Sequence, residues 1–159
     1  MIASRAPKGY KCPVCLGIQG SDSPDTLITS TDFVYKDDLV VALINSFFTG
    51  KNVGHVIVVP KKHFENIYDL PVEYGHRVFD VSQKIALAMK SAYKCDGITI
   101  RQFNEPASDQ HAFHYHLHVF PRYDNDGFNE VSPSDKRLAE SDERKQYADR
   151  IKAVLENIK

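Results

Sequence analysis

Short runs of β-branched and aromatic residues, separated by polar turns, recur along this chain. Each run has the length of a strand and is bounded by residues that favour turns. The five runs cover residues 31–35, 38–45, 55–59, 98–103 and 113–120. An Asp-rich turn joins the first two runs, and Pro60 ends the third. The pattern therefore predicts five strands.

Two other segments carry apolar residues at helical spacing. The first stripe consists of Val78, Val81, Ile85, Met89 and Ala92. Pro71 suits the first turn of this helix, and Gly97 is expected just past its end. The second stripe lies in a predicted C-terminal helix, capped near Ser141, and consists of Tyr147, Ile151, Val154, Leu155 and Ile158.

The order of these elements decides the expected fold class. Strands come in neighbouring pairs, and one long helix separates the third strand from the fourth. This order predicts an α+β fold, in which helices cover one face of a five-stranded antiparallel sheet. We expect a single domain over residues 1–159, with an irregular N-terminal segment (1–30) and a C-terminal extension (123–159) that contains the last helix.

Composition and charge exclude several classes of protein. The chain has 159 residues, of which 42% are hydrophobic, enough for the core of one domain. Lys and Arg number 20 against 21 Asp and Glu, so the net charge of −1 does not favour binding to duplex nucleic acid. No apolar run approaches the ~18–20 residues of a membrane span, and the first residues do not resemble a secretory signal. We therefore expect a cytoplasmic protein.

The N-terminal segment contains a Cys-x-x-Cys motif, formed by Cys12 and Cys15. The chain has 3 cysteines, and an odd number argues against a disulfide framework. A redox pair would require a strand before the motif and a helix after it, and neither is visible. Zinc binding is the favoured interpretation, with a redox role and no special role as the alternatives.

Histidines are concentrated in the fifth predicted strand. His114, His116 and His118 alternate there with Tyr115 and Leu117, so the imidazoles are expected to share one face while Phe113, Tyr115, Leu117 and Val119 face the core. One interpretation is a metal site made of three imidazoles. The other is an uncharged imidazole nucleophile, whose second ring nitrogen donates to a backbone carbonyl, with a protonated neighbour to bind an anion. The remaining alternative is a solvent-exposed polar face on which three histidines occur by chance.

The sequence resembles the histidine triad (HIT) family from about Cys12 to Arg122. The matching motifs are Gly54-His55, Pro60-Lys-Lys-His63, Gln110, and His114-Tyr-His116-Leu-His118, which occur in the family's order. The closing histidine of the last motif is typical of the Hint and Fhit-like branch. The resemblance implies the HIT-like version of the fold predicted above.

The resemblance also implies catalytic roles. The middle histidine, His116, would attack the α-phosphate of a nucleotide conjugate and form a nucleotidyl-histidine intermediate that water hydrolyses. His118 would contact the α-phosphate, and His55 would support the hydrogen-bond network. Gln110 and Asn104 would line the phosphate site.

The resemblance places the rest of the nucleotide on the second predicted strand. Asn45 would hold the ribose hydroxyls, and Leu43 and Ile44 would flank the base. Some bacterial-type members bind structural zinc through residues that correspond here to Cys12, Cys15, His63 and His114. Two thiolates and two imidazoles suit a closed tetrahedral site for Zn²⁺.

Two positions depart from the family pattern. Asp109 replaces a glycine, although Asp tolerates a left-handed backbone, and its carboxylate would repel phosphate unless it points away. His111 replaces a hydroxyl residue, and is either a substitute proton donor or simply exposed.

The resemblance implies a HIT-family hydrolase or transferase that acts on nucleoside phosphoramidates or dinucleoside polyphosphates. It also implies AMP-containing substrates and a homodimer. The alternatives are a nucleotide-binding interaction protein with little turnover, and a metal-dependent hydrolase that uses the three triad histidines as ligands.

Overall fold

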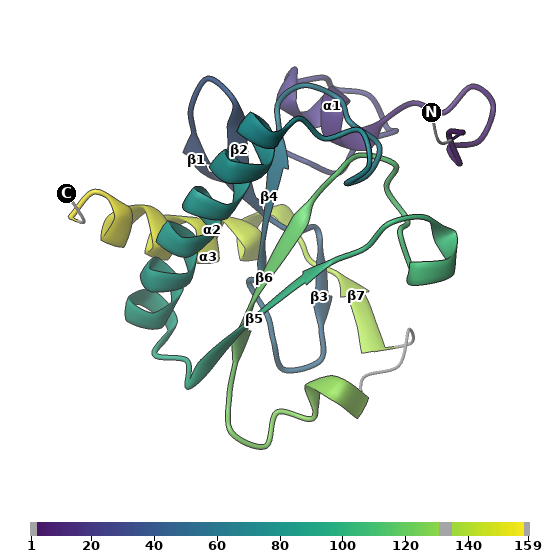
Figure 1. Cartoon of the computed structure of the whole chain (residues 1–159). Helices are drawn as coiled ribbons and strands as arrows, with labels where there is room; N and C mark the ends of the chain where they lie inside the picture. Colours follow the sequence, from purple (N-terminus) through teal and green to yellow (C-terminus); the bar gives the residue numbers. More distant parts are fainter. Residues whose placement is uncertain (1–2, 131–134, 158–159) are drawn as a thin grey trace.

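A computed structural model describes residues 3–130 and 135–157. Its centre is a five-stranded antiparallel sheet in the order β1-β2-β4-β6-β5 (Figure 1). The strands are β1 (Phe33–Lys36), β2 (Val40–Ile44), β4 (Val56–Pro60), β6 (Leu117–Arg122) and β5 (Gly97–Gln102). The predicted α+β class and the five-stranded antiparallel sheet are therefore confirmed.

Two helices cover one face of this sheet. They are α2 (Val72–Tyr93) and α3 (Ser141–Leu155), seen together beside the sheet in Figure 1. The stripe predicted for α2 forms its inner face, since Val78, Val81 and Ile85 are buried in the main core. Ile151 of α3 joins the same core, while Ile158 lies outside the described residues.

The other face of the sheet is covered in part by the N-terminal segment. A short helix, α1 (Pro13–Ile18), begins directly after Cys12, whose thiol accepts a hydrogen bond from the N–H of Cys15. Val14 packs there against Val41 and Ile57. This helix is not predicted from the sequence, because α1 has only 6 residues and is too short to show a helical period.

The N-terminal end of α2 agrees with the prediction, but the C-terminal end does not. Pro71 is the N-cap residue, as expected for a proline that opens a helix. The helix ends at Tyr93, and Lys94 takes the left-handed conformation with φ 56°. The prediction that Gly97 ends the helix is wrong, because that glycine already begins β5.

The last strand begins later than predicted. β6 starts at Leu117, and residues 113–116 lie outside the ladder. β4 ends at Pro60, which has no N–H to offer a neighbour. The N–H of Tyr115 instead donates to the carbonyl of Phe64 at 2.6 Å. Strand alternation therefore applies to the triad only from Leu117 onward, and Phe113 packs edge-on against Tyr10 rather than in the main core.

A second sheet of two strands was not predicted. β3 (Phe47–Thr49) pairs with β7 (Lys136–Leu138), which ties the C-terminal extension to the segment after β2. Each strand has only three residues, too few for a visible pattern. The remaining short elements are the 3-10 helices η1 (Ser30–Asp32), η2 (Pro106–Ser108) and η3 (Phe128–Glu130). In the described part of the chain, no helix combines the length and apolarity that crossing a membrane requires.

Candidate active site and metal site

His116 is held by a hydrogen bond to its own backbone segment. Its Nδ1 lies 2.6 Å from the carbonyl oxygen of His114. Since a carbonyl only accepts, Nδ1 carries the proton and Nε2 keeps a lone pair. Among the described residues, Nε2 has no hydrogen-bond partner and is not one of the fully buried unpartnered atoms, so a small part of its surface is accessible. This is the tautomer expected for an imidazole nucleophile.

Burial keeps His116 uncharged. Desolvation lowers the pKa of this ring, and the charge of the exposed His111 acts in the same direction. The hydrogen bond to His114 opposes both effects but does not outweigh them. The lone pair on Nε2 is therefore available at neutral pH.

His118 lies beside His116, with 4.7 Å between the ring centroids. Its ring stacks on Phe120, and its Nδ1 is buried without a partner. Burial lowers the pKa of His118 well below 6.5, and the charges of His116, His55, Lys136 and Arg101 lower it further. These effects favour the neutral ring, contrary to the protonated neighbour that the sequence interpretation placed beside the nucleophile. A neutral ring with its proton on Nε2 can still donate to a phosphate oxygen.

His55 lies next to the triad, directly before the first residue of β4. It is 1% exposed, stacks on Phe120 at 4.2 Å, and lies 5.5 Å from the ring of His118. Its Nε2 is 2.7 Å from the amide nitrogen of Asn45. Burial, and then the charges of His116 and Lys136, lower the pKa of His55 to about 3. The rings of His55, His116 and His118 therefore form one group of neutral imidazoles, two of which stack on Phe120.

Cross-strand pairing explains why these side chains meet. Leu43, Ile57, His118 and Arg101 pair in one row across β2, β4, β6 and β5, and so share a face. The next row on the same face contains Asn45 and His55, and the N–H of Asn45 donates to the carbonyl of His55. Because successive side chains of a strand point to opposite faces, only every second residue of each strand can reach the histidine face.

The same alternation places the two residues predicted to flank the base on opposite faces of β2. Leu43 is on the histidine face but fully buried, in a cluster with Val41 and Ile57. Ile44 points to the opposite face and belongs to the helix-covered core. The prediction that Ile44 flanks a base is wrong for this structure, because alternation along β2 turns it away from the triad.

Asn45 has hydrogen-bond partners within the chain. Its amide group donates to His55, and its Oδ1 accepts from the N–H of Phe47 at 3.2 Å. A contact with ribose stays a prediction, since it would add to or replace these bonds.

The loop before the triad is braced by Gln110. This side chain is 3% exposed, and its Nε2 donates to the carbonyls of Glu65 and Ala112. Its Oε1 accepts from the N–H of Glu105. Both amide protons are therefore used by the loop itself, and a phosphate contact by Gln110 stays a prediction.

Asn104 also connects two loops. Its Oδ1 accepts from the N–H of Ile67 at 2.8 Å, and its amide donates to Gln102. Asp109 has φ 67° in the left-handed region, as expected for a residue that replaces glycine there. His111 is exposed, which leaves both of its interpretations open.

A second group of side chains forms a candidate metal site. The ligand atoms of Cys12, Cys15, His63 and His114 all lie within 4.8 Å of one another. Sulfur-to-nitrogen distances are 3.4 Å for Cys12–His114 and for Cys15–His63, and 3.5 Å for Cys15–His114. A tetrahedral zinc ion places such atoms about 3.6 Å apart.

The chemistry of these groups fits zinc as well. Nε2 of His114 lies 2.9 Å from the carbonyl oxygen of Pro60 and must donate to it, which leaves the Nδ1 lone pair directed at the thiols. Burial and the neighbouring Cys12 raise the pKa of Cys15 to about 12. A divalent cation reverses such a shift by binding the thiolate. Neither His116 nor His118 belongs to this group, and the described residues contain no other cluster of this kind.

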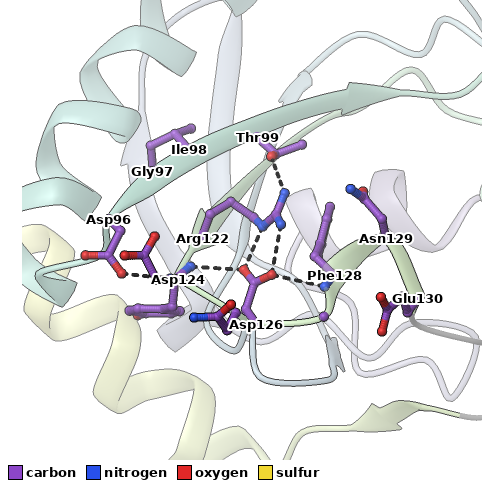
Figure 2. A pocket seen from close by; sticks show the side chains of 13 residues that line it. Asp96, Gly97, Ile98, Thr99, Arg122, Asp124, Asp126, Phe128, Asn129 and Glu130 are labelled. Carbon is purple, nitrogen blue, oxygen red and sulfur yellow. Dashed lines mark hydrogen bonds and ion pairs between the residues drawn. The ribbon is translucent and has the colours of Figure 1, made fainter.

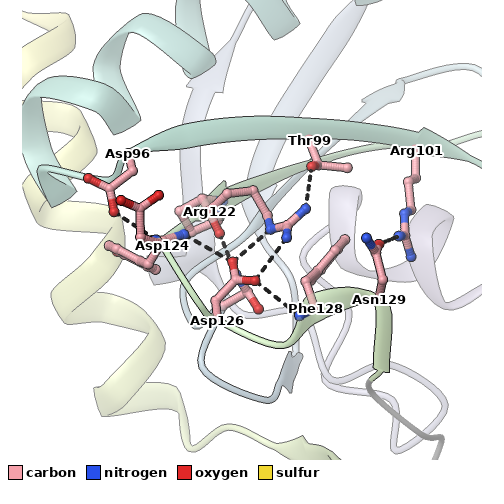
Figure 3. A network of polar contacts seen from close by, with 11 residues as sticks. Asp96, Thr99, Arg101, Arg122, Asp124, Asp126, Phe128 and Asn129 are labelled. Carbon is pink, nitrogen blue, oxygen red and sulfur yellow. Dashed lines mark hydrogen bonds and ion pairs between the residues drawn. The ribbon is translucent and has the colours of Figure 1, made fainter.

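A cavity of about 540 Å³ lies away from the triad, between β5 and the turn that follows β6 (Figure 2). Acidic residues of this region are Asp96, Asp124, Asp126 and Glu130. Asp126 is the centre of a polar network, in which it accepts from Nε of Arg122 at 2.7 Å and from Asn52 (Figure 3). The carboxylate of Asp126 is therefore used by hydrogen bonds within the fold.

Comparison with known proteins identifies the family. The HIT domain matches residues 28–125. "Protein hit" of Bacillus subtilis is 36% identical over 99 residues, which are 62% of this chain and 67% of that protein. A Zn-bound histidine triad family protein from Mycobacterium smegmatis aligns with TM-score 0.74 and 27% identity, over 93% of this chain and 95% of that one.

A third similarity concerns the fold alone. The diadenosine triphosphate hydrolase of Plasmodium falciparum aligns with TM-score 0.70 over 82% of this chain and 80% of that one, at 16% identity. The five-stranded sheet, the neutral histidine group and these matches define a histidine triad protein. The chain belongs to the HIT family.

Proposed function

We propose that this chain hydrolyses, or transfers, the nucleotidyl group of nucleotide conjugates through His116. The observation that carries the proposal is the fixed tautomer of this ring, with Nδ1–H donating to His114 and the Nε2 lone pair left without a partner in the described part of the chain. Membership of the HIT family supports the reaction class.

The reaction has two displacement steps. Nε2 of His116 forms a bond to the α-phosphorus while the bond to the leaving group breaks, and the leaving group takes a proton. Water then attacks the same phosphorus, releases the nucleoside monophosphate and restores the neutral ring. Nε2–H of His118 donates to a phosphate oxygen in both steps. His111, exposed and electrostatically coupled to His116, is the candidate proton donor.

The proposed substrates are nucleoside phosphoramidates and dinucleoside polyphosphates that contain AMP. Zinc, when bound by Cys12, Cys15, His63 and His114, supplies a structural cross-link between α1 and the segment before β6. The metal-dependent alternative lacks support, because Nδ1 of His116 is used by a carbonyl and His118 lies outside the metal cluster.

Steady-state assays with adenosine phosphoramidate and diadenosine tetraphosphate test this proposal. Wild type should release AMP, and His116→Ala should lose at least ~100-fold in kcat/KM. His76→Ala, which changes an exposed histidine on α2, is the matched control and should retain full activity. Unchanged turnover in His116→Ala would contradict the proposal.

One observation favours a second candidate, a nucleotide-binding protein with little turnover. Both amide protons of Gln110 are used by backbone carbonyls, so the loop before the triad offers fewer donors to a phosphate. Titration calorimetry with AMP separates the two candidates: binding without AMP release from either substrate would favour this one.

A homodimer is proposed as the assembled form. Phe79 and Leu87 on α2 are 62% and 57% exposed, and Ile100 lies on the edge strand β5. A second copy would cover these apolar side chains. Sedimentation of wild type and Leu87→Glu at micromolar concentration tests this assembly, since only wild type should sediment as a dimer.

A further inference from the structure

Arg101 lies directly across from His118. The two residues pair in register between β5 and β6, so their side chains share the histidine face. The Arg101 guanidinium is 4.3 Å from the centroid of the Phe128 ring, and its Nη2 donates to Oδ1 of Asn129 at 3.0 Å (Figure 3). These contacts fix a cation beside the ring proposed to bind phosphate.

A second cation, Lys136, lies on the C-terminal extension. It begins β7 and pairs with Thr49, the last residue of β3, while Phe47 at the start of β3 donates its N–H to Asn45, the partner of His55. Lys136 is exposed. Burial and the neighbouring imidazoles are the larger causes of the lowered pKa of His55 and of His118, and the charge of Lys136 lowers both pKa values further. Two cations, from elements far apart in sequence, therefore act on one group of histidines.

Other arginines in this region are neutralised, but these two cations are not. Arg122, on the other side of Phe128, has an ion pair with Asp126, and Arg137, next to Lys136, has one with Glu143 at 2.6 Å. Within residues 3–130 and 135–157, no carboxylate lies within 4.0 Å of the charged group of Arg101 or Lys136. Such uncompensated charge beside a phosphate-transfer site favours an anionic ligand.

We propose that Arg101 and Lys136 form a subsite for the phosphate chain of the leaving group. This inference rests on the proposed function and narrows its substrate class to conjugates with two or more phosphates, in preference to phosphoramidates. A phosphate chain carries charge beyond the α-phosphorus, whereas the amine of a phosphoramidate offers these cations nothing to bind. Lys136 lies outside the matched HIT domain, so this part of the subsite belongs to the C-terminal extension.

The test is the ratio of kcat/KM for diadenosine tetraphosphate to that for adenosine phosphoramidate. Lys136→Gln and Arg101→Gln should each lower this ratio several-fold, and the double variant at least ten-fold. Arg101→Lys should restore part of the ratio, which a purely structural role would not do. Arg137→Gln removes the same charge one residue from Lys136 and should leave the ratio unchanged.

Two outcomes separate the subsite from the underlying reaction. An unchanged ratio in the double variant, with turnover that still requires His116, overturns the subsite alone. Turnover that does not require His116 overturns the proposed function first. If wild type binds without turnover, calorimetry with inorganic tripolyphosphate replaces the ratio: affinity should fall at least ten-fold in the double variant but not in Arg137→Gln, and equal affinity overturns the subsite.

Discussion

The backbone carbonyl of His114 accepts the Nδ1–H of His116 at 2.6 Å, while the ring of His114 faces the two cysteines. One residue thus connects the candidate metal site to the tautomer of the proposed nucleophile. Anything that displaces His114 should disturb the direction of Nε2 on His116.

The first prediction follows from this connection. Cys15→Ser removes one of the four proposed zinc ligands, so the variant should hold less zinc than wild type, unfold at lower temperature and lose at least ~10-fold in kcat. Metal content by mass spectrometry, thermal unfolding and single-turnover assays measure the three effects.

Cys95→Ala is the matched control for this variant. Cys95 is buried in the main core, far from the cluster, and its substitution should leave the zinc content unchanged. Full zinc content in Cys15→Ser would contradict the assignment of the ligands.

Gly54 should not tolerate a side chain. Its φ is +73°, and a Cβ there would lie 2.4 Å from Cδ1 of Tyr147 on α3. Gly54→Ala should lower the free energy of unfolding by about 2–4 kcal/mol, from left-handed strain and overpacking together. Urea denaturation measures this change.

Gly20→Ala separates the two causes. Gly20 has a similar φ of +71° but no heavy atom within 4 Å of the added Cβ. It should cost about 1–2 kcal/mol, from strain alone. Equal costs at Gly20 and Gly54 would show that contact with Tyr147 is unimportant.

The sequence predicts the parts of this fold that repeat. β-branched runs and the stripe of Val81, Ile85 and Met89 are set by periodicity, and the structure has the corresponding sheet and helix. α1, β3 and β7 are too short to carry a period, so they were missed. The predicted start of β6 was wrong, because Pro60 on the neighbouring strand β4 ends the pairing, and this cannot be read from residues 113–120 alone.

The site shows a similar division. The motifs contain the triad and the four candidate metal ligands, and the fold brings the ligand atoms of those four within 4.8 Å of one another. The position of Arg101 across from His118 depends on the register of β5 and β6, which is a tertiary property. The opposite orientation of Ile44 follows from alternation and could have been predicted from His55 and Val56, once β2 and β4 were paired.

Arg144 is expected to be a major determinant of stability. It is 4% exposed, and its Nε lies 2.8 Å from Oδ1 of Asp32, which has no exposed surface. Arg144→Met leaves that carboxylate without its cation and should cost about 3–5 kcal/mol of unfolding free energy.

Denaturation of two further variants checks the cause. Asp32→Leu/Arg144→Met removes both charges and should recover part of the loss. Lys145→Ala, on the exposed side of α3, should change stability by about 0.5 kcal/mol or less. A double variant less stable than Arg144→Met would contradict the account.

His55 should make stability depend on pH. Its pKa is about 3 in the native state and about 6.5 in the unfolded chain, so the unfolded state binds more protons between these values. The stability contribution of the neutral ring is complete above pH ~6.5 and is lost on acidification, by up to about 1.4 kcal/mol per pH unit.

Urea denaturation between pH 5 and 8 should therefore give a shallower pH dependence for His55→Gln than for wild type. His76→Gln changes an exposed histidine and should follow wild type. Parallel curves for wild type and His55→Gln would contradict the assignment of a neutral, buried ring.

The most direct measurement is a rapid quench of wild type with labelled diadenosine tetraphosphate, followed by peptide mass mapping. The account predicts an adenylyl group on the peptide with His116, stable in alkali and labile in acid. Label on a different residue, or hydrolysis in single turnover with no adduct at any time, would contradict attack by Nε2 of this ring.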